Sequence, residues 1–159
     1  MVSLTGWQAG VQTNSSYSSA RIKKIDVERI QSEIDRNHSI VIVTGFQGIN
    51  KYGDITTLGR GGSDTSAVAL AAALQADLCQ IYTDVDGVYT ADPEKDPTAT
   101  KFSEITYDEI YHKGLKVMDL TATTMCKENH LPIYVFNMDV YGNLKKVMEG
   151  ENIGTLVHN

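Results

Sequence analysis

The chain has 159 residues, of which 42% are hydrophobic, and a formal net charge of −6. This length and composition predict one compact domain with a real core, spanning residues 1–159. The net negative charge argues against a general surface for binding nucleic acids or anionic membranes, because both need Lys and Arg clustered on one face. The sequence has no leader-like start and no apolar run of membrane length, so we expect a cytoplasmic protein with no membrane partner.

The first third of the chain contains one clear helix and one clear strand. Residues 1–24 are rich in Ser, Gly, Gln and Asn, and we expect them to be loop-like or hairpin-like. From Asp26, a natural cap, apolar residues recur at helical spacing as far as Ile34. The β-branched run at 40–43 predicts a strand buried on both faces, and residues 45–54 are expected to form a loop.

The segment Thr56–Asp64 is a Gly-rich turn that leads into an Ala-rich helix, expected over 63–76. Its glycines, Ser63 as N-cap and the N–H groups of the first helical turn would form a cradle for a phosphate or carboxylate. Arg60 would add a bidentate fork for the same anion. Gly-rich turns also occur as plain strand-to-helix connectors, and that alternative stays open. The spacing matches neither a Walker loop nor a dinucleotide fingerprint.

A second buried strand is expected over 78–83. Strand, glycine loop, helix and strand in this order predict a βαβ unit with a parallel sheet and a right-handed crossover. Ligands bind beyond the carboxyl ends of such strands, so the loops at 45–64 and 83–92 should lie on one rim. Cys79 and Cys126 show no metal-ligand spacing and are expected to be buried, reduced thiols.

The second half of the chain continues the alternation of helices and strands. Thr106 is expected to cap a short helix that ends at His112 before a turn at 113–114. The remaining elements expected are a helix at 117–128, a strand at 133–136, a helix at 143–148 and an extended tail at 154–157. The layout predicts an α/β fold.

The loop at 83–93 places three carboxylates just past a strand. The position of Gly87 excludes an EF-hand calcium loop. Two alternatives remain. In a nucleotide pocket, Tyr89 would pack on an adenine or ribose, Asp92 would accept from sugar hydroxyls, and Thr83 would contact base or phosphate. In the other, the loop is a capped turn with solvated acids.

For Lys116 the sequence likewise leaves open a functional and a purely structural interpretation. At the start of the predicted helix its ammonium could reach a phosphate, or it could simply be solvated.

Two sets of segments resemble known kinases. Residues 3–10, 45–48, 56–64 and 82–93 resemble bacterial aspartokinase. Residues 92–100, 114–119, 131–138 and 142–157 resemble bacterial UMP kinase, and the Val-Leu-His-Pro-like phrase of aspartokinases is absent near Lys116. Both families belong to the amino-acid kinase superfamily. The resemblance implies a three-layer αβα fold with a mainly parallel sheet, and phosphoryl transfer from Mg-ATP to aspartate or UMP.

The resemblance also implies roles for individual residues, with ATP or ADP and Mg²⁺ as cofactors. The substrate cradle would consist of Arg60, Gly61, Gly62 and Ser63. The catalytic residues would be Asp64, which organises lysines, and Lys116. The nucleotide contacts would be Thr83, Asp84, Tyr89, Asp92, Lys116 and Val117. Glu94 stands where aspartokinases tend to have Arg.

The aspartokinase resemblance begins in mid-domain, without the Lys-Phe-Gly-Gly-type phosphate motif. We therefore expect a chimera, recombined or engineered, with an aspartokinase-like segment 1–93 and a UMP-kinase-like segment 94–159 joined within 86–93. We expect the chain to keep nucleotide binding, whereas its kinase activity would be weak or absent. The alternative is a fold scaffold that binds no ligand. An exposed sheet edge would favour a homodimer.

Overall fold

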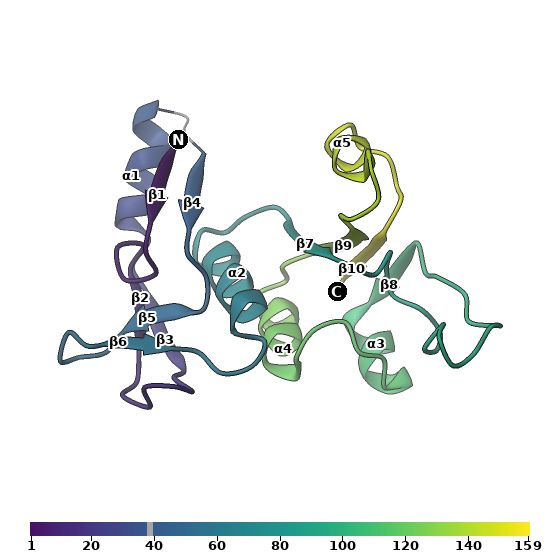
Figure 1. Ribbon diagram of the computed structural model, residues 1–159, viewed down its shortest axis with the longest axis horizontal. Coiled ribbons are helices and arrows are strands. Elements are labelled where there is room, and N and C mark those ends of the chain that lie inside the picture. Colours follow the sequence, from purple (N-terminus) through teal and green to yellow (C-terminus); the bar gives the residue numbers. More distant parts are fainter. Residues whose placement is uncertain (38–39) are drawn as a thin grey trace. The chain divides into compact units, whose positions relative to one another are not determined.

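The computed structural model describes residues 1–37 and 40–159. They form two compact units, unit 1 at Met1–Ala76 and unit 2 at Asp77–Asn159 (Figure 1). Each unit combines strands with helices, so the predicted α/β class is confirmed, with mixed sheets. The single domain expected over 1–159 stays a prediction. None of the helices in the described part of the chain is long and apolar enough to cross a membrane.

The start of unit 1 is a two-stranded parallel sheet covered by a helix. Strand β1 (Val2–Leu4) pairs with β4 (Val41–Val43), and helix α1 (Glu28–Asn37) packs its apolar side against them through the buried residue Ile30. The helix begins where predicted, because the Asp26 carboxylate accepts a hydrogen bond from the backbone N–H of Glu28 at 3.1 Å.

The prediction that residues 40–43 are buried on both faces is wrong. Ile40 is 71% exposed and Ile42 46% exposed. The reason is that β4 pairs, within the described residues, with β1 alone and packs one face only. Val41 and Val43 are the residues that contact the cluster around Ile30.

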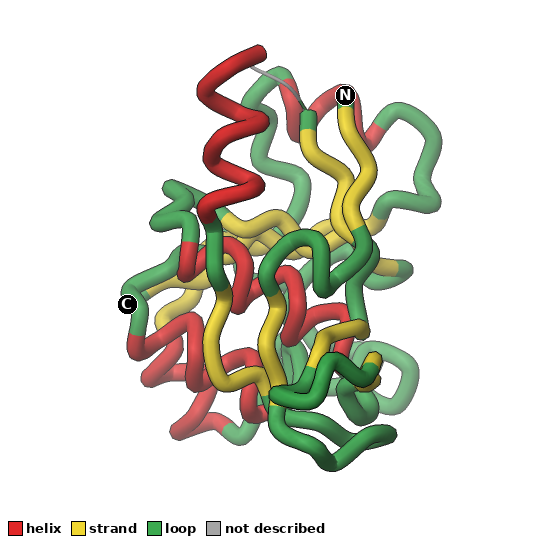
Figure 2. Tube along the Cα trace, turned by 90° about the vertical axis from the view of Figure 1, so that its left-hand side faces the viewer, coloured by secondary structure: helices red, strands yellow, loops and turns green. Residues whose placement is uncertain are grey.

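Unit 1 contains a second sheet of four short strands in the order β3-β2-β5-β6. Figure 2 shows these strands in yellow among the loops that join them. The hairpin expected near the start of the chain is present as an antiparallel pair, β2–β3, and β2 pairs with β5 in parallel. The strands are β2 (Val11–Thr13), β3 (Ile22–Ile25), β5 (Gln47–Ile49) and β6 (Ile55–Thr57).

The loop predicted at 45–54 is instead largely a hairpin, since β5 pairs antiparallel with β6. The turn between the strands is closed by the Asn50 side chain, whose Oδ1 accepts from the backbone N–H groups of Tyr52 and Asp54 at 2.9 Å each. Asn side chains stabilise turns in this way without any Asn-Gly signature, which is why the pattern was missed.

Helix α2 (Gly62–Ala73) is the last element of unit 1. The predicted cap at Ser63 is wrong, because Gly61 occupies the N-cap position in a left-handed conformation (φ 71°) with no side-chain capping bond. Glycine adopts this conformation without steric cost, so the chain can turn into the helix two residues before Ser63. The helix also ends before the predicted 76, since Gln75 has a positive φ of 53°.

Unit 2 is built on a mixed sheet in the order β7-β9-β10-β8, which joins β7 to β9 in parallel and β9 to β10 antiparallel. Its core includes Ile133, Phe136 and Val157, all fully buried. The strands are β7 (Cys79–Thr83), β8 (Glu104–Thr106), β9 (Ile133–Asn137) and β10 (Thr155–His158). The helices are α3 (Tyr107–Lys113), α4 (Leu120–Glu128) and α5 (Asn143–Met148).

Most predicted elements of unit 2 are confirmed, with two differences. Strand β8 was not predicted. Helix α4 begins at Leu120, three residues later than expected, because the Asp119 carboxylate caps it by accepting from the Ala122 N–H at 2.8 Å. Lys116 therefore lies in the connection before the helix and not in its first turn.

Strands β4 and β7 belong to different units, and β4 pairs with β1 while β7 pairs with β9. The βαβ unit and the shared rim of the two loops therefore stay predictions. Cys79 and Cys126 are both buried and in no disulfide, as predicted. Burial raises the pKa of the Cys126 thiol to about 11.

The start of α3 offers a test of the local stability of unit 2. The Thr106 hydroxyl accepts from the Glu109 N–H at 3.2 Å, and the Glu109 carboxylate accepts from the Thr106 N–H at 3.1 Å. We expect Thr106→Ala to lower the free energy of unfolding by about 1 kcal/mol in urea denaturation. Thr121→Ala is the control, because Thr121 is exposed and makes no side-chain hydrogen bond with the described residues. An equal loss in both variants would contradict the capping role.

Candidate functional site

Unit 2 contains a cavity of about 640 Å³ beside the end of β7. Its walls are the loop Asp84–Pro93, the segment Lys113–Lys116 and Asn137. Small-molecule sites in proteins have volumes of roughly 300–1,000 Å³, so this cavity is large enough for a ligand of nucleotide size.

The loop that forms the main wall is fastened to the sheet by buried hydrogen bonds. The Thr155 hydroxyl on β10 accepts from the Val88 N–H at 2.9 Å and donates to the Phe102 carbonyl. Gly87 precedes this contact with φ 153°, and a Cβ there would overlap the Thr155 hydroxyl. Only glycine therefore allows the loop to approach β10 this closely.

The cavity is also bounded by the ends of two parallel strands. Asn137, the last residue of β9, donates from its side chain to the Asp84 carbonyl at 2.8 Å, just after β7 ends. The Met138 N–H donates to the Thr83 carbonyl at 2.9 Å. These two bonds hold the start of the loop against the neighbouring strand.

Tyr89 is tied to the loop through its hydroxyl. The hydroxyl donates to the Asp86 carboxylate at 2.8 Å, and Lys101 lies 3.6 Å from the same carboxylate. The hydrogen bond to Asp86 raises the pKa of Tyr89, so the phenol stays protonated at neutral pH. The hydroxyl proton is therefore already used in the bond to Asp86. The half-buried ring is the part of Tyr89 that can contact a ligand.

Asp92 stands in a capped turn beside the cavity. Its carboxylate accepts from the Glu94 N–H at 3.1 Å and pairs with Lys95 at 3.1 Å, so it caps a turn. It also lines the cavity. The hydrogen bond from Lys95 lowers the pKa of Asp92, which is therefore ionised at neutral pH.

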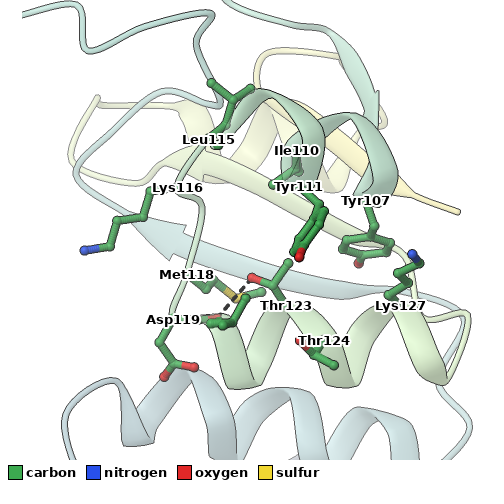
Figure 3. Close-up of a pocket in the computed structure, with 12 residues that line it drawn as sticks. Tyr107, Ile110, Tyr111, Leu115, Lys116, Met118, Asp119, Thr123, Thr124 and Lys127 are labelled. Atoms are coloured by element: carbon green, nitrogen blue, oxygen red, sulfur yellow. Dashed lines mark hydrogen bonds between the residues drawn. The ribbon is translucent and has the colours of Figure 1, made fainter.

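Lys116 stands in the connection between α3 and α4. Gly114 ends α3 in a left-handed conformation (φ 62°), and the Leu115 N–H donates to the Ile110 carbonyl at 3.0 Å. Lys116 is exposed and lines both the cavity of the loop and a neighbouring cavity of about 770 Å³ between the two helices. In Figure 3 its side chain extends away from Tyr107 and Tyr111, which line the second cavity.

Four of the predicted nucleotide contacts thus line one cavity: Asp84, Tyr89, Asp92 and Lys116. Thr83 and Val117 flank these residues in the chain but do not line it. Asn137 was missed in the sequence analysis. The usable signal was its place at the carboxyl end of a buried strand, where ligands of parallel sheets are bound.

The predicted substrate cradle lies in unit 1, at the start of α2. Arg60 and Ser63 are exposed there, while Asp64 is half-buried. The glycines do not all leave room for a ligand, because a Cβ on Gly62 would come within 2.7 Å of both Leu58 and Phe46. The missing side chain of Gly62 therefore allows the close packing of the helix start.

The loop before the hairpin is bonded directly to this helix start. The Ser66 hydroxyl donates to the Gly62 carbonyl at 2.7 Å and accepts from the Phe46 N–H at 2.9 Å. The turn at Gly45 and Phe46 is thereby held beside Ser63, with 3.7 Å between the Ser63 Cα and an ideal Cβ on Gly45. The roles assigned to Arg60, Gly61, Gly62, Ser63 and Asp64 stay predictions.

A comparison with protein-family models matches residues 2–137 to the amino acid kinase family. The chain belongs to this family. Curated members of the family that resemble it have two different names, and the chain spans half or less of their length. A uridylate kinase of Parabacteroides distasonis is 72% identical over 127 residues, which are 80% of this chain and 50% of that protein. An aspartokinase of Geobacillus stearothermophilus is 53% identical over 137 residues, 84% of this chain and 33% of that protein.

Solved structures of this amino acid kinase family have the same fold. E. coli aspartokinase III in complex with aspartate and ADP matches with a TM-score of 0.74 at 29% identity, over 100% of this chain and 35% of that one. UMP kinase from Bacillus anthracis matches with a TM-score of 0.66 at 27% identity, over 82% of this chain and 50% of that one. The predicted membership of the amino-acid kinase superfamily is therefore confirmed.

The anchor of the cavity loop gives a second prediction. Thr155 is fully buried, and we expect Thr155→Val to lower the free energy of unfolding by about 1–3 kcal/mol, because it leaves the Val88 N–H and the Phe102 carbonyl without their partner. Thr155→Ser keeps the hydroxyl and should lose less. Urea denaturation of the two variants measures the difference, and a larger loss in the serine variant would refute the anchor.

Proposed function

We propose that the cavity of unit 2 binds ATP or ADP with Mg²⁺, and that the chain takes part in phosphoryl transfer to the carboxylate of aspartate. The observation that carries the proposal is the gathering of Asp84, Tyr89, Asp92 and Lys116 around one cavity of about 640 Å³. These residues come from two segments that are 20 or more positions apart in the chain, and the resemblance assigns all four to the nucleotide.

Each of these side chains has chemistry that suits a nucleotide. The Tyr89 ring offers an apolar face to a base or ribose, and the ionised Asp92 accepts hydrogen bonds from sugar hydroxyls. The exposed ammonium of Lys116 is a compact cation for a phosphate. Asn137 adds a second polar side chain at the strand end.

Magnesium fits this arrangement as an ion held by the nucleotide. No group of three or more His, Cys, Asp or Glu side chains within residues 1–37 and 40–159 is arranged to hold a metal ion. Mg²⁺ is commonly bound through one or two carboxylates together with substrate phosphates, and Asp84 is a candidate carboxylate. Such transfers are catalysed mainly by positioning and charge neutralisation.

The acceptor is assigned to the start of α2, with Arg60 as its principal contact. Arg60 is exposed and makes no hydrogen bond or ion pair with the other described residues, so its guanidinium fork is available to a carboxylate. The solved relative that contains both aspartate and ADP supports the choice of acceptor and nucleotide.

UMP is the second candidate acceptor. The observation in its favour is the 72% identity with a uridylate kinase, which exceeds the 53% identity with an aspartokinase. A phosphate is also a suitable partner for an Arg fork. Assays with aspartate and with UMP under the same conditions decide between the two.

The lengths of the matches bear on the idea of a chimera joined within 86–93. The uridylate kinase match of 127 residues is longer than the whole stretch after Asp92, and the aspartokinase match of 137 residues is longer than the whole stretch before it. Each likeness therefore crosses the proposed join. The expected chimera joins two related kinases, so a match that crosses the join fits both a chimera and an undivided kinase, and the chimera stays a prediction.

Isothermal titration with Mg-ADP tests the proposed nucleotide site. We expect saturable binding to one site, weakened about tenfold or more by Asp92→Ala, since an ionised hydrogen-bond acceptor is lost. Asp96→Ala is the matched control, because Asp96 also caps a turn in the connection between β7 and β8, by accepting from the Thr98 N–H at 2.9 Å, but does not line the cavity. Equal losses in both variants, or no binding by the folded protein, would reject the site and favour an inert scaffold.

Arg60→Ala tests the division of roles between the two units. The affinity for ADP should stay unchanged, while turnover of the acceptor should fall by about 10²-fold or more if Arg60 stabilises the reacting carboxylate. The measurements are ADP titration and a coupled assay of ADP release with aspartate or UMP. A loss of ADP affinity equal to that of Asp92→Ala would contradict the assignment.

A further inference from the structure

Unit 1 contains a polar cavity that is separate from both proposed sites. It has a volume of about 490 Å³ and lies where β2, β3 and β5 run side by side, together with the turns after β2 and β5. None of the described residues that line it is acidic, although the chain as a whole carries a net charge of −6. Its polar lining includes Gln12, Asn14, Ser15, Lys23, Asn50 and Lys51.

A β-bulge brings Lys23 to this cavity. In the β2–β3 pair Gln12 lies opposite Lys24 and Thr13 lies opposite Ile22, so the register shifts and Lys23 is the extra residue. Bulges redirect the side chain of the extra residue relative to a regular strand. Lys23 accordingly lines the cavity, whereas its neighbour Lys24 does not.

A turn closed by the Asn50 side chain brings Lys51 to the same cavity. Lys51 follows Asn50, whose side chain accepts from the N–H groups of Tyr52 and Asp54 and closes the turn. The Lys51 ammonium stands 4.8 Å from the centre of the Tyr52 ring. The carboxylate of this turn, Asp54, is bonded to the Tyr17 hydroxyl at 2.9 Å and to the Asn50 amide at 3.2 Å, and it does not line the cavity.

The arrangement leaves two cations at one cavity with no acid in its wall. Two like charges that share a partly enclosed space repel one another, and an anion between them relieves the repulsion. Gln12 and Ser15 add neutral hydrogen-bond donors, and neither side chain has a hydrogen-bond partner among the described residues. The cavity therefore combines positive charge with unused donors.

We propose that this cavity is an anion site that binds a phosphate group, either as inorganic phosphate or as part of a small phosphorylated molecule. Phosphate is favoured over a carboxylate because a phosphate monoester carries about −1.5 to −2 charges at pH 7, which matches two ammonium groups. The site uses residues of unit 1 only and is independent of the nucleotide cavity in unit 2.

The experiment is a ¹H–¹⁵N NMR titration of the whole chain, at constant ionic strength, with inorganic phosphate and in parallel with glycerol 3-phosphate. We expect saturable shifts of the amides of Asn14, Ser15 and Lys51. Tighter binding of the ester would identify a phosphorylated small molecule as the ligand class, and equal or tighter binding of inorganic phosphate would identify the free ion. Shifts confined to residues 84–93 would overturn the proposal, because the anion would then occupy the nucleotide cavity alone.

Charge-matched variants separate a site from general attraction to cations. Lys23→Gln and Lys51→Gln should each weaken phosphate binding about tenfold or more, which corresponds to about 1.4 kcal/mol. Lys24→Gln removes the same charge from the neighbouring residue, outside the cavity wall, and should leave the affinity within about twofold. All three substitutions are at exposed positions, and the same spectra report whether each variant is folded. Equal losses in the three variants, or shifts that never saturate, would overturn the proposal.

Discussion

The candidate nucleotide site depends on one buried hydroxyl. Thr155 on β10 accepts from the Val88 N–H and donates to the Phe102 carbonyl, so it joins the cavity loop to the sheet and to the chain that returns after the loop. The Phe102 N–H donates back to the Val88 carbonyl at 2.8 Å, which closes a short ribbon beside the cavity. Because the bond between Thr155 and the Val88 N–H is buried, the loop backbone around Val88 has few other conformations available to it.

This anchoring explains how a loop with so many polar side chains can form a binding wall. The Tyr89 hydroxyl is bonded to Asp86, and Asp92 is bonded to Glu94 and Lys95, before any ligand arrives. A wall whose side chains are already ordered costs little conformational entropy on binding. The same internal bonds limit what the loop can offer to the ring of Tyr89 and the remaining lone pairs of Asp92.

The sequence was informative wherever a local signal determines the structure. Asp26 and Thr106 cap the helices that they were predicted to cap, and α5 has the bounds expected from its pattern. Prediction failed where the deciding contact is distant or depends on burial. The exposure of Ile42 depends on which strands flank β4, and the Val88–Thr155 bond joins residues 67 positions apart.

The same distinction applies to the site residues. Lys116 and Tyr89 could be selected from motifs, whereas the signal for Asn137 is only its place at the end of a strand, because its contact with the loop depends on β9 lying beside β7. Gly62 shows what a motif alone leaves out. The glycine-rich motif predicts close approach to an anion, and the structure shows in addition that the missing side chain makes room for Leu58 and Phe46. A motif indicates which residue type a position requires, and the contacts around that position show a structural reason for the requirement.

Exposed cations are common in this chain, so an unpaired charge does not by itself indicate a ligand. Lys24 has no ion pair with the described residues and lines no cavity described above, as expected for a solvated surface group. Lys23 and Lys116 differ from it because each is brought to a cavity wall by a specific backbone feature. For Lys23 this feature is the β-bulge, and for Lys116 it is the connection between the end of α3 at Gly114 and the cap of α4 at Asp119. A backbone irregularity that places a cation beside an enclosed space is a stronger indication of anion binding than the charge alone, since the irregularity contributes nothing to regular pairing.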